Sequence, residues 1–131
     1  MKAILFLILP MLLLANHVHW QGDYDKALQE AHQEHKPLLV LVVKRETPLC
    51  GEIIKTTLMN QPYVDRINQE MIAVIVTYEG KLSYPIELYY TTHFPTLFFV
   101  NSEHETFLQT PLYEQNITVE RLEKFFKNHP N

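Results

Sequence analysis

The chain has 131 residues, of which 47% are hydrophobic and 20% are charged, and this composition fits one globular domain rather than two domains or a disordered chain. Its formal net charge is −4 at pH 7, and Lys and Arg form no runs. Nucleic acids and anionic membrane surfaces attract basic patches, so we expect neither of them as a partner.

The N-terminus has the features of a secretory signal peptide. Lys2 precedes an apolar run over residues 3–14, and Ala15 supplies a small residue near the expected cleavage site. A membrane anchor is the alternative, but a spanning helix needs about 20 apolar residues and Pro10 interrupts this shorter run. We therefore expect a signal peptide over residues 1–16. Residues 17–131 should then form one periplasmic or secreted domain, with no stable membrane insertion after cleavage.

The domain is predicted to begin with a helix and a strand. Asp23 is a good N-cap, and the apolar residues that follow it recur at helical spacing until Pro37 stops the pattern. Residues 38–43 are continuously apolar and rich in β-branched side chains. Such a run is typical of a central strand that is covered on both faces.

A second helix and a second strand follow. Pro48 suits the first turn of a helix, and its apolar stripe is expected to end where Gln61 and Pro62 break the pattern. Residues 71–76 are again apolar and predict another buried strand. Beyond a polar stretch, residues 85–90 have the pattern of a short helix.

The C-terminal part is predicted to contain a hairpin and a helix. Residues 96–100 and 106–110 have strand character, and the short loop between them favours antiparallel pairing. Thr118 is the expected cap of a terminal helix with an apolar face. The first two strands need a parallel crossover, so the whole order predicts an α/β fold with a mixed four-stranded sheet flanked by helices.

Particular residues carry a family resemblance across the mature chain. The Lys36-Pro37 pair leads into the first strand, the segment Glu46-Thr47-Pro48-Leu49-Cys50 follows that strand, and Phe94-Pro95-Thr96 comes before the third. In this order and spacing the chain resembles exported thioredoxin-like proteins. The resemblance implies the thioredoxin fold, a Cys-x-x-Cys motif where this chain has Thr-Pro-Leu-Cys, and a cis-proline at Pro95 that faces the motif.

The departures from that family bear on the chemistry. Thr47 stands where the attacking cysteine would be, Glu46 replaces the tryptophan, and Leu41 occupies the place of a buried acid in thioredoxins proper. A threonine hydroxyl can cap a helix, but it cannot join a disulfide. We therefore interpret Thr47 first as a helix cap, and we expect no dithiol cycle.

Cys50 is the single cysteine of the chain, and three interpretations of it stay open. It is an inert core residue, since it shares its helix stripe with isoleucines. Alternatively, it is a single-thiol site that forms mixed disulfides with an exported protein or a small thiol, because the first turn of a helix favours a thiolate. The third, a peroxidase-like site, rests on the Thr-x-x-Cys spacing and is weakened because Val43 replaces that motif's proline.

The sequence leaves two functional classes. One is a single-thiol redox protein with Cys50 and Thr47 at its centre. The other is a redox-inactive module for peptide binding or folding assistance, whose groove would include Pro48, Leu49 and the Phe94-Pro95-Thr96 segment. The seven histidines lack a recognisable ligand spacing, so we expect no metal site and no cofactor; the oligomeric state is not predicted.

Overall fold

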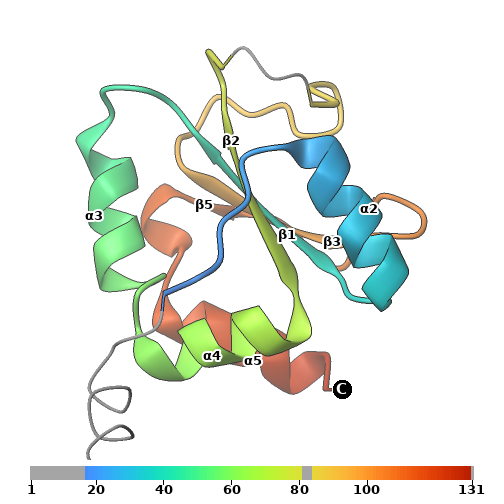
Figure 1. Ribbon diagram of the computed structural model, residues 1–131. Helices are drawn as coiled ribbons and strands as arrows, with labels where there is room; N and C mark the ends of the chain where they lie inside the picture. The colour runs from blue at the N-terminus through green and yellow to red at the C-terminus, as the bar shows by residue number, and fades with distance from the viewer. Residues whose placement is uncertain (1–16, 81–83, 131) are drawn as a thin grey trace, which may run out of the picture.

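The computed structural model describes residues 17–80 and 84–130, and the predicted signal peptide lies outside them. Its strands form one mixed sheet with helices on both faces (Figure 1). In chain order the elements are α2 (Tyr24–Glu34), β1 (Leu38–Val43), α3 (Pro48–Thr56), α4 (Gln61–Glu70), β2 (Ile72–Thr77), β3 (Thr96–Asn101), β4 (Thr106–Phe107), β5 (Leu112–Tyr113), η1 (Glu114–Asn116) and α5 (Val119–Asn128).

The strand order is β2-β1-β3-β4, with β5 also paired with β3. β1 runs parallel to β2, and all pairs made by β3 are antiparallel. The expected parallel crossover and antiparallel edge are confirmed, and the short strand β5 adds to the four expected strands. Since Val42 pairs with Thr96, the end of β1 and the start of β3 lie at the same end of the sheet.

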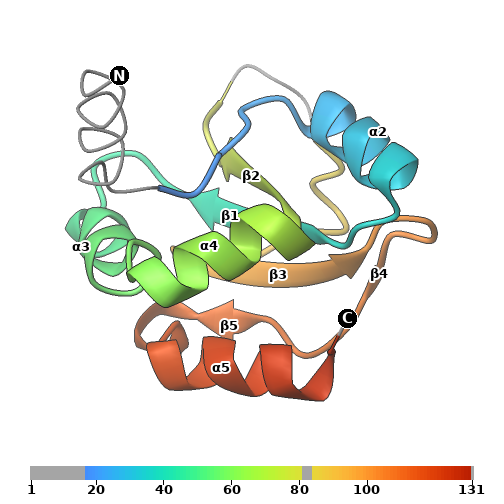
Figure 2. The same cartoon turned by 60° about the horizontal axis from the view of Figure 1, so that its bottom comes forward.

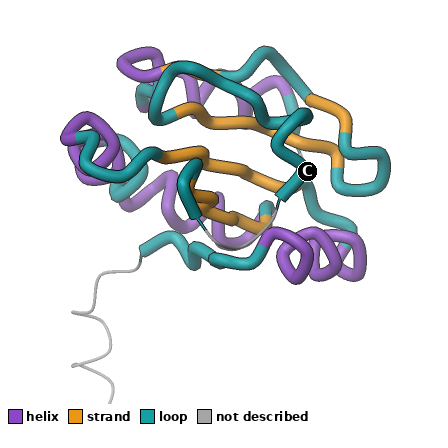
Figure 3. The backbone as a smooth tube through the Cα atoms, turned by 90° about the horizontal axis from the view of Figure 1, so that it is seen from above, coloured by secondary structure: helices purple, strands orange, loops and turns teal. Residues whose placement is uncertain are grey.

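Two apolar layers cover the sheet, one on each face. α2 packs on one face, where Tyr24 and the alanines of the helix meet the even-numbered residues of β1. Helices α3, α4 and α5 contribute to the core on the other face, which includes Leu39 and Leu41. Figures 2 and 3 show helices on both sides of the strands. Within the described residues, no helix is long and apolar enough to cross a membrane.

The helix ends follow from local sequence. The Asp23 carboxylate accepts the Lys26 amide at the start of α2, and the Thr118 hydroxyl accepts the Arg121 amide at the start of α5. Both expected N-caps are thus confirmed. α2 ends at a left-handed residue, His35, just before Pro37.

Three expectations about the elements were wrong. α3 already ends at Thr56, and Gln61 and Pro62 do not stop it but begin α4, because proline fits the first turn of a helix. Residues 85–90 form a turn closed by the Leu88 and Tyr89 amides on the Pro85 carbonyl, and no helix forms there. The predicted strand over residues 106–110 is confined to β4, because the chain bends before Pro111 and pairs again as β5.

Candidate functional site

The residues predicted to form a site lie at one end of the sheet. The loop after β1 carries Thr47, and the turn before β3 carries Phe94 and Pro95. The Val42–Thr96 register brings both loops to this end, and the Tyr78 amide donates to the Val43 carbonyl at 2.8 Å beside them. The carboxyl ends of β1 and β2 therefore meet the amino end of β3 here.

Thr47 and Cys50 flank the start of α3. Thr47 holds the N-cap position, and its carbonyl accepts the Cys50 amide at 3.0 Å. Its hydroxyl makes no capping bond and instead lies 3.4 Å from the Arg45 carbonyl, as a weak donor. The expectation that the Thr47 side chain caps the helix was therefore wrong. Proline at N1 removes one orphan amide, which lessens the need for a side-chain cap.

The Cys50 thiol is nearly enclosed. The residue is 6% exposed, and within the described part of the chain no hydrogen bond to its sulfur is recorded. Leu41 is fully buried in the core layer that also holds Ile53 of α3, so this strand position supplies no titratable group. The only thiol of the chain is therefore largely shielded from solvent, and the buried Leu41 offers it no acid or base.

The turn before β3 presents Phe94. The Phe94-Pro95 peptide bond is cis, as the resemblance implied. The Thr96 side chain is buried, and its hydroxyl donates to the His93 carbonyl and contacts the Thr91 hydroxyl at 3.0 Å. The Thr91 hydroxyl also accepts the His93 amide. Thr96 thus shapes the turn, in which Thr92 and His93 are exposed and Phe94 is half-buried against the core layer under α2.

The two loops touch through Lys44. Its ammonium group lies 5.7 Å from the centroid of the Phe94 ring, on the ring face. Tyr78 also packs against Phe94, with the two ring centroids 5.3 Å apart. The contact of Lys44 with Phe94 thus joins the β1–α3 loop to the turn before β3. Pro48 is exposed and Leu49 half-buried on the adjoining turn of α3.

The β1–α3 loop and the residues that follow β2 are also linked at this end of the sheet. Glu46 adopts a positive φ of 57°, and the Arg45 amide donates to the Glu79 carboxylate at 3.0 Å, so the β1–α3 loop is tied to the end of β2. Tyr84 lies close enough to Tyr78 for the two to interact electrostatically, and burial raises the pKa of the Tyr84 hydroxyl. That hydroxyl therefore stays neutral at ordinary pH.

Sequence reasoning missed the residues beside Pro95. The Glu114 amide donates to the Pro95 carbonyl at 2.9 Å, and the Glu114 carboxylate contacts His93 Nδ1 at 3.0 Å. Tyr113 pairs with Thr96 across β5 and β3 and stacks edge-on against His93. Only the pairing of β3 with β5 brings these residues together. The sequence signal was weak, because β5 has just two residues.

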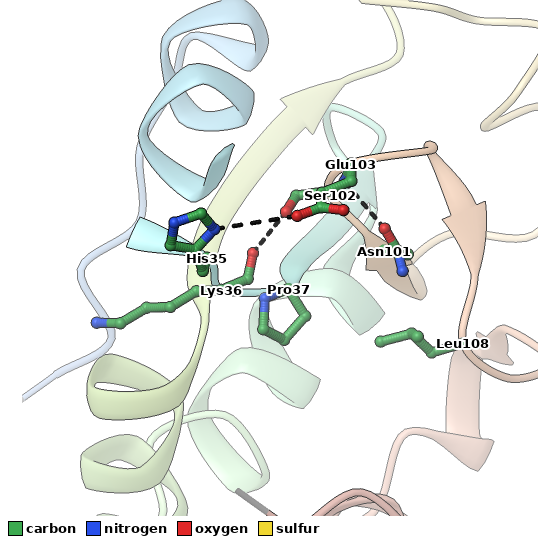
Figure 4. A pocket seen from close by; sticks show the side chains of 7 residues that line it. All are labelled: His35, Lys36, Pro37, Asn101, Ser102, Glu103 and Leu108. Atoms are coloured by element: carbon green, nitrogen blue, oxygen red, sulfur yellow. Dashed lines mark hydrogen bonds and ion pairs between the residues drawn. The ribbon is translucent and has the colours of Figure 1, made fainter. Parts of the chain in front are cut away.

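A separate hollow lies at the opposite end of the sheet, between the start of β1 and the end of β3 (Figure 4). Its polar groups are already engaged: the Ser102 hydroxyl donates to the Lys36 carbonyl at 2.8 Å, and His35 lies 3.9 Å from Glu103. None of the predicted site residues lines it. In residues 17–80 and 84–130, no group of three or more His, Cys, Asp and Glu side chains converges as metal ligands would.

Comparison with known proteins places this geometry in a known fold. No family model matches the chain, and no curated protein matches it. A solved thioredoxin from Thermus thermophilus aligns with a TM-score of 0.71 at 14% identity, covering 86% of this chain and 87% of that one.

Two further solved structures agree. The C-terminal domain of Neisseria meningitidis DsbD in the oxidised form aligns with a TM-score of 0.64 at 18% identity, covering 84% of this chain and 99% of the other. A DsbH oxidoreductase gives 0.62 at 18% identity, covering 86% and 85%. The chain therefore has the thioredoxin-like fold, and it carries a single cysteine where a dithiol site needs two.

Proposed function

We propose that this thioredoxin-fold protein binds an extended stretch of polypeptide at Phe94 and catalyses no dithiol exchange. Among the described residues, neither the amide nor the carbonyl of Phe94 makes a hydrogen bond. The turn around it is nevertheless held by the hydrogen bonds of the Thr91 and Thr96 hydroxyls. Backbone groups left unpaired beside a strand are what an added strand needs. The unpaired Phe94 backbone is the observation that carries the proposal.

The surroundings of Phe94 support the same function. Its own ring and the exposed ring of Tyr78 offer apolar area for side chains of a bound segment. The Phe94 ring is in contact with the Tyr78 ring and with the Lys44 ammonium group, which hold it in place. Aromatic groups that are held in place bind with little loss of conformational entropy.

A permanently unfolded protein tests this function directly. We expect reduced, carboxymethylated α-lactalbumin to shift the amide NMR signals of Phe94 and Tyr78 and to leave Ser102, at the far end of the sheet, unchanged. Phe94→Ala should lose most of the binding, while Phe107→Ala, which removes another partly exposed ring, should keep it. Equal binding by the two variants, or no shift at Phe94 in the parent protein, would contradict the proposal.

Mixed-disulfide formation through Cys50 is the second candidate. It is favoured by the place of Cys50 in the first turn of α3, and opposed by its burial. Iodoacetamide labelling separates the two functions. If the peptide-binding function holds, Cys50 should be modified only when the protein unfolds, whereas the half-exposed thiol of a Thr47→Cys, Cys50→Ser variant should react in the native state. Rapid native labelling of Cys50 would favour the mixed-disulfide function with an exported protein or a small thiol.

We also propose that the domain acts in the periplasm or outside the cell. The apolar run over residues 3–14 supports this, and packing supports a cut before Val18. Val18 is buried in the core, and Asn68 bonds to the His17 carbonyl and the His19 amide. Terminal sequencing of the exported protein should therefore find a start at or just before His17. An uncleaved Met1 on membrane-bound material would contradict the location.

A further inference from the structure

A groove of about 500 Å³ adjoins the Phe94 turn. Residues 90–93 line one side of it, and β5 with η1 lines the other. The groove and the Phe94 backbone share a wall, because His93 precedes Phe94 and the Glu114 amide bonds to the Pro95 carbonyl. A polypeptide segment bound at Phe94 would therefore place one of its own side chains in the groove.

The groove holds two exposed aromatic rings. Tyr90 is 66% exposed and Tyr113 is 36% exposed, so both rings are accessible from solvent. Neither is needed to close the core, and Tyr113 is fixed by its strand pairing with Thr96 and its ring contact with His93. Faces of tyrosine rings attract cations through their negative quadrupole.

A carboxylate lies beside these rings. One oxygen of Glu114 contacts His93, and no partner of the other oxygen is recorded within the described ranges. Glu114 has a φ of 48°, and its amide bond to Pro95 fixes this conformation. No Lys or Arg side chain lines the groove. An anionic group would thus meet an acceptor that it cannot bond, while a cation would find an open acceptor and ring faces.

We propose that this groove binds a lysine or arginine side chain of the polypeptide held at Phe94, so that the protein selects basic extended segments. This inference rests on the proposed function and names its ligand class. Glu114 would accept the charged group, Tyr90 and Tyr113 would flank it, and His93 would hold Glu114 in position. The negative net charge of the chain favours the same ligands at longer range.

The test uses end-blocked peptides of Ser, Thr and Val in which a single Lys is placed at each position in turn. Each peptide is compared with the same peptide that carries norleucine in place of Lys. Norleucine keeps the apolar stem and removes the charge. At the best position we expect the Lys peptide to bind about fivefold to tenfold tighter, as a partly exposed ion pair and ring contacts allow. The amides of Tyr113 and Glu114 should shift with Lys and much less with norleucine.

Variants assign the preference to the groove. Glu114→Gln keeps the amide bond to Pro95 and should remove most of the Lys preference without weakening the norleucine peptide. Glu103→Gln is the matched control, since it removes the same charge from a residue that also neighbours a histidine, but at the opposite end of the sheet. Tyr90→Leu should lower the preference, and Tyr90→Phe should retain it.

The outcomes separate the two proposals. Norleucine peptides that shift Phe94 while Lys gives no advantage would overturn the basic-segment preference and leave peptide binding intact. A Lys preference that survives in Glu114→Gln would overturn it too. Failure of every peptide to shift Phe94 would instead remove the proposed function itself.

Discussion

At Thr47 the chain has a hydroxyl where the resemblance implies an attacking thiol. The residue keeps the backbone arrangement of such a site, since its carbonyl accepts the Cys50 amide at 3.0 Å in the first turn of α3. Its hydroxyl takes no part in capping. Cys50 retains the position of the second sulfur, which in a dithiol site resolves the mixed disulfide rather than forming it.

The replacement of one sulfur leads to a prediction about Thr47→Cys. We expect the parent protein to give no catalysis of insulin reduction by dithiothreitol, and the variant to form an internal disulfide and gain weak activity. The neighbouring Glu46 carboxylate disfavours a thiolate, and Leu41 cannot relay a proton. Activity should therefore be lower than that of a thioredoxin by roughly tenfold or more.

Two measurements check the Thr47→Cys prediction. Thiol counts before and after oxidation should show that both cysteines are consumed in the single variant, and adding Cys50→Ser should abolish the gained activity. Strong turnover by the parent protein would mean that Thr47 does not replace the attacking residue. A variant that keeps two free thiols after oxidation would show that positions 47 and 50 are not placed as a pair.

At the element scale, capping differs between two helices that both begin after a threonine. Thr118 accepts the Arg121 amide at 3.2 Å, whereas Thr47 makes no cap bond. Thr118→Ala should therefore lower the free energy of unfolding by about 1 kcal/mol, and Thr47→Ala by only a few tenths. Urea titration of both variants checks this difference. Equal losses of stability would show that the Thr118 cap hydrogen bond does not contribute to the free energy of unfolding.

The same scale shows which elements the sequence could predict. β1, β2 and β3 were predicted because their buried runs are continuously apolar, and α2 and α5 because an apolar stripe follows a capping residue. α4 was missed because a Gln-Pro pair can end one helix and begin the next, and local pattern does not distinguish these cases. β4 and β5 are two residues long, and only their pairing with β3 defines them.

The candidate site was predictable only in part, for the same reason. The cis bond at Pro95 was expected from the family resemblance, and the burial of Cys50 from its helix stripe. The Glu114–His93 contact joins η1 to the turn before β3, and it depends on the register between β3 and β5. Local sequence carries no signal for such a register when one strand has two residues.

At the scale of the whole molecule, the layer under α2 contains a hydrogen-bond network that links segments distant in the sequence. The Tyr24 and Tyr89 hydroxyls lie 2.7 Å apart, and the Tyr24 hydroxyl donates to the Glu105 carboxylate at 3.0 Å. Because that hydroxyl has one proton, Tyr89 must be the donor to Tyr24. This network joins α2, the turn over residues 86–89 and the β3–β4 loop. It therefore stabilises the segment that leads to Phe94.

Burial of these hydroxyls predicts a loss of stability in alkali. Desolvation raises the pKa of Tyr24 well above its usual value and raises the pKa of Tyr89 to about 12. Tyrosines of the unfolded chain ionise near pH 10, so from pH 10 upward the unfolded state releases protons that the folded state keeps. The stabilisation is fully present below pH 10. Above pH 10, ionisation of Tyr24 and of Tyr89 in the unfolded chain should each lower the free energy of unfolding by about 1.4 kcal/mol per pH unit. Each contribution stops growing once the pH reaches the folded-state pKa of that tyrosine.

Urea titrations at several pH values between 9 and about 12 measure this slope. Lysines and other groups that titrate in the same range contribute equally to parent and variant, so the comparison is made by difference. Tyr89→Phe should be less stable at neutral pH because Tyr24 loses a donor, yet its stability should fall less steeply above pH 10. Tyr90→Phe is the matched control, since the neighbouring Tyr90 is largely exposed and should leave the slope unchanged. Identical slopes for the parent and Tyr89→Phe would mean that the Tyr24–Tyr89–Glu105 chain opens before the molecule unfolds, and the segment before Phe94 would then lack its brace at high pH.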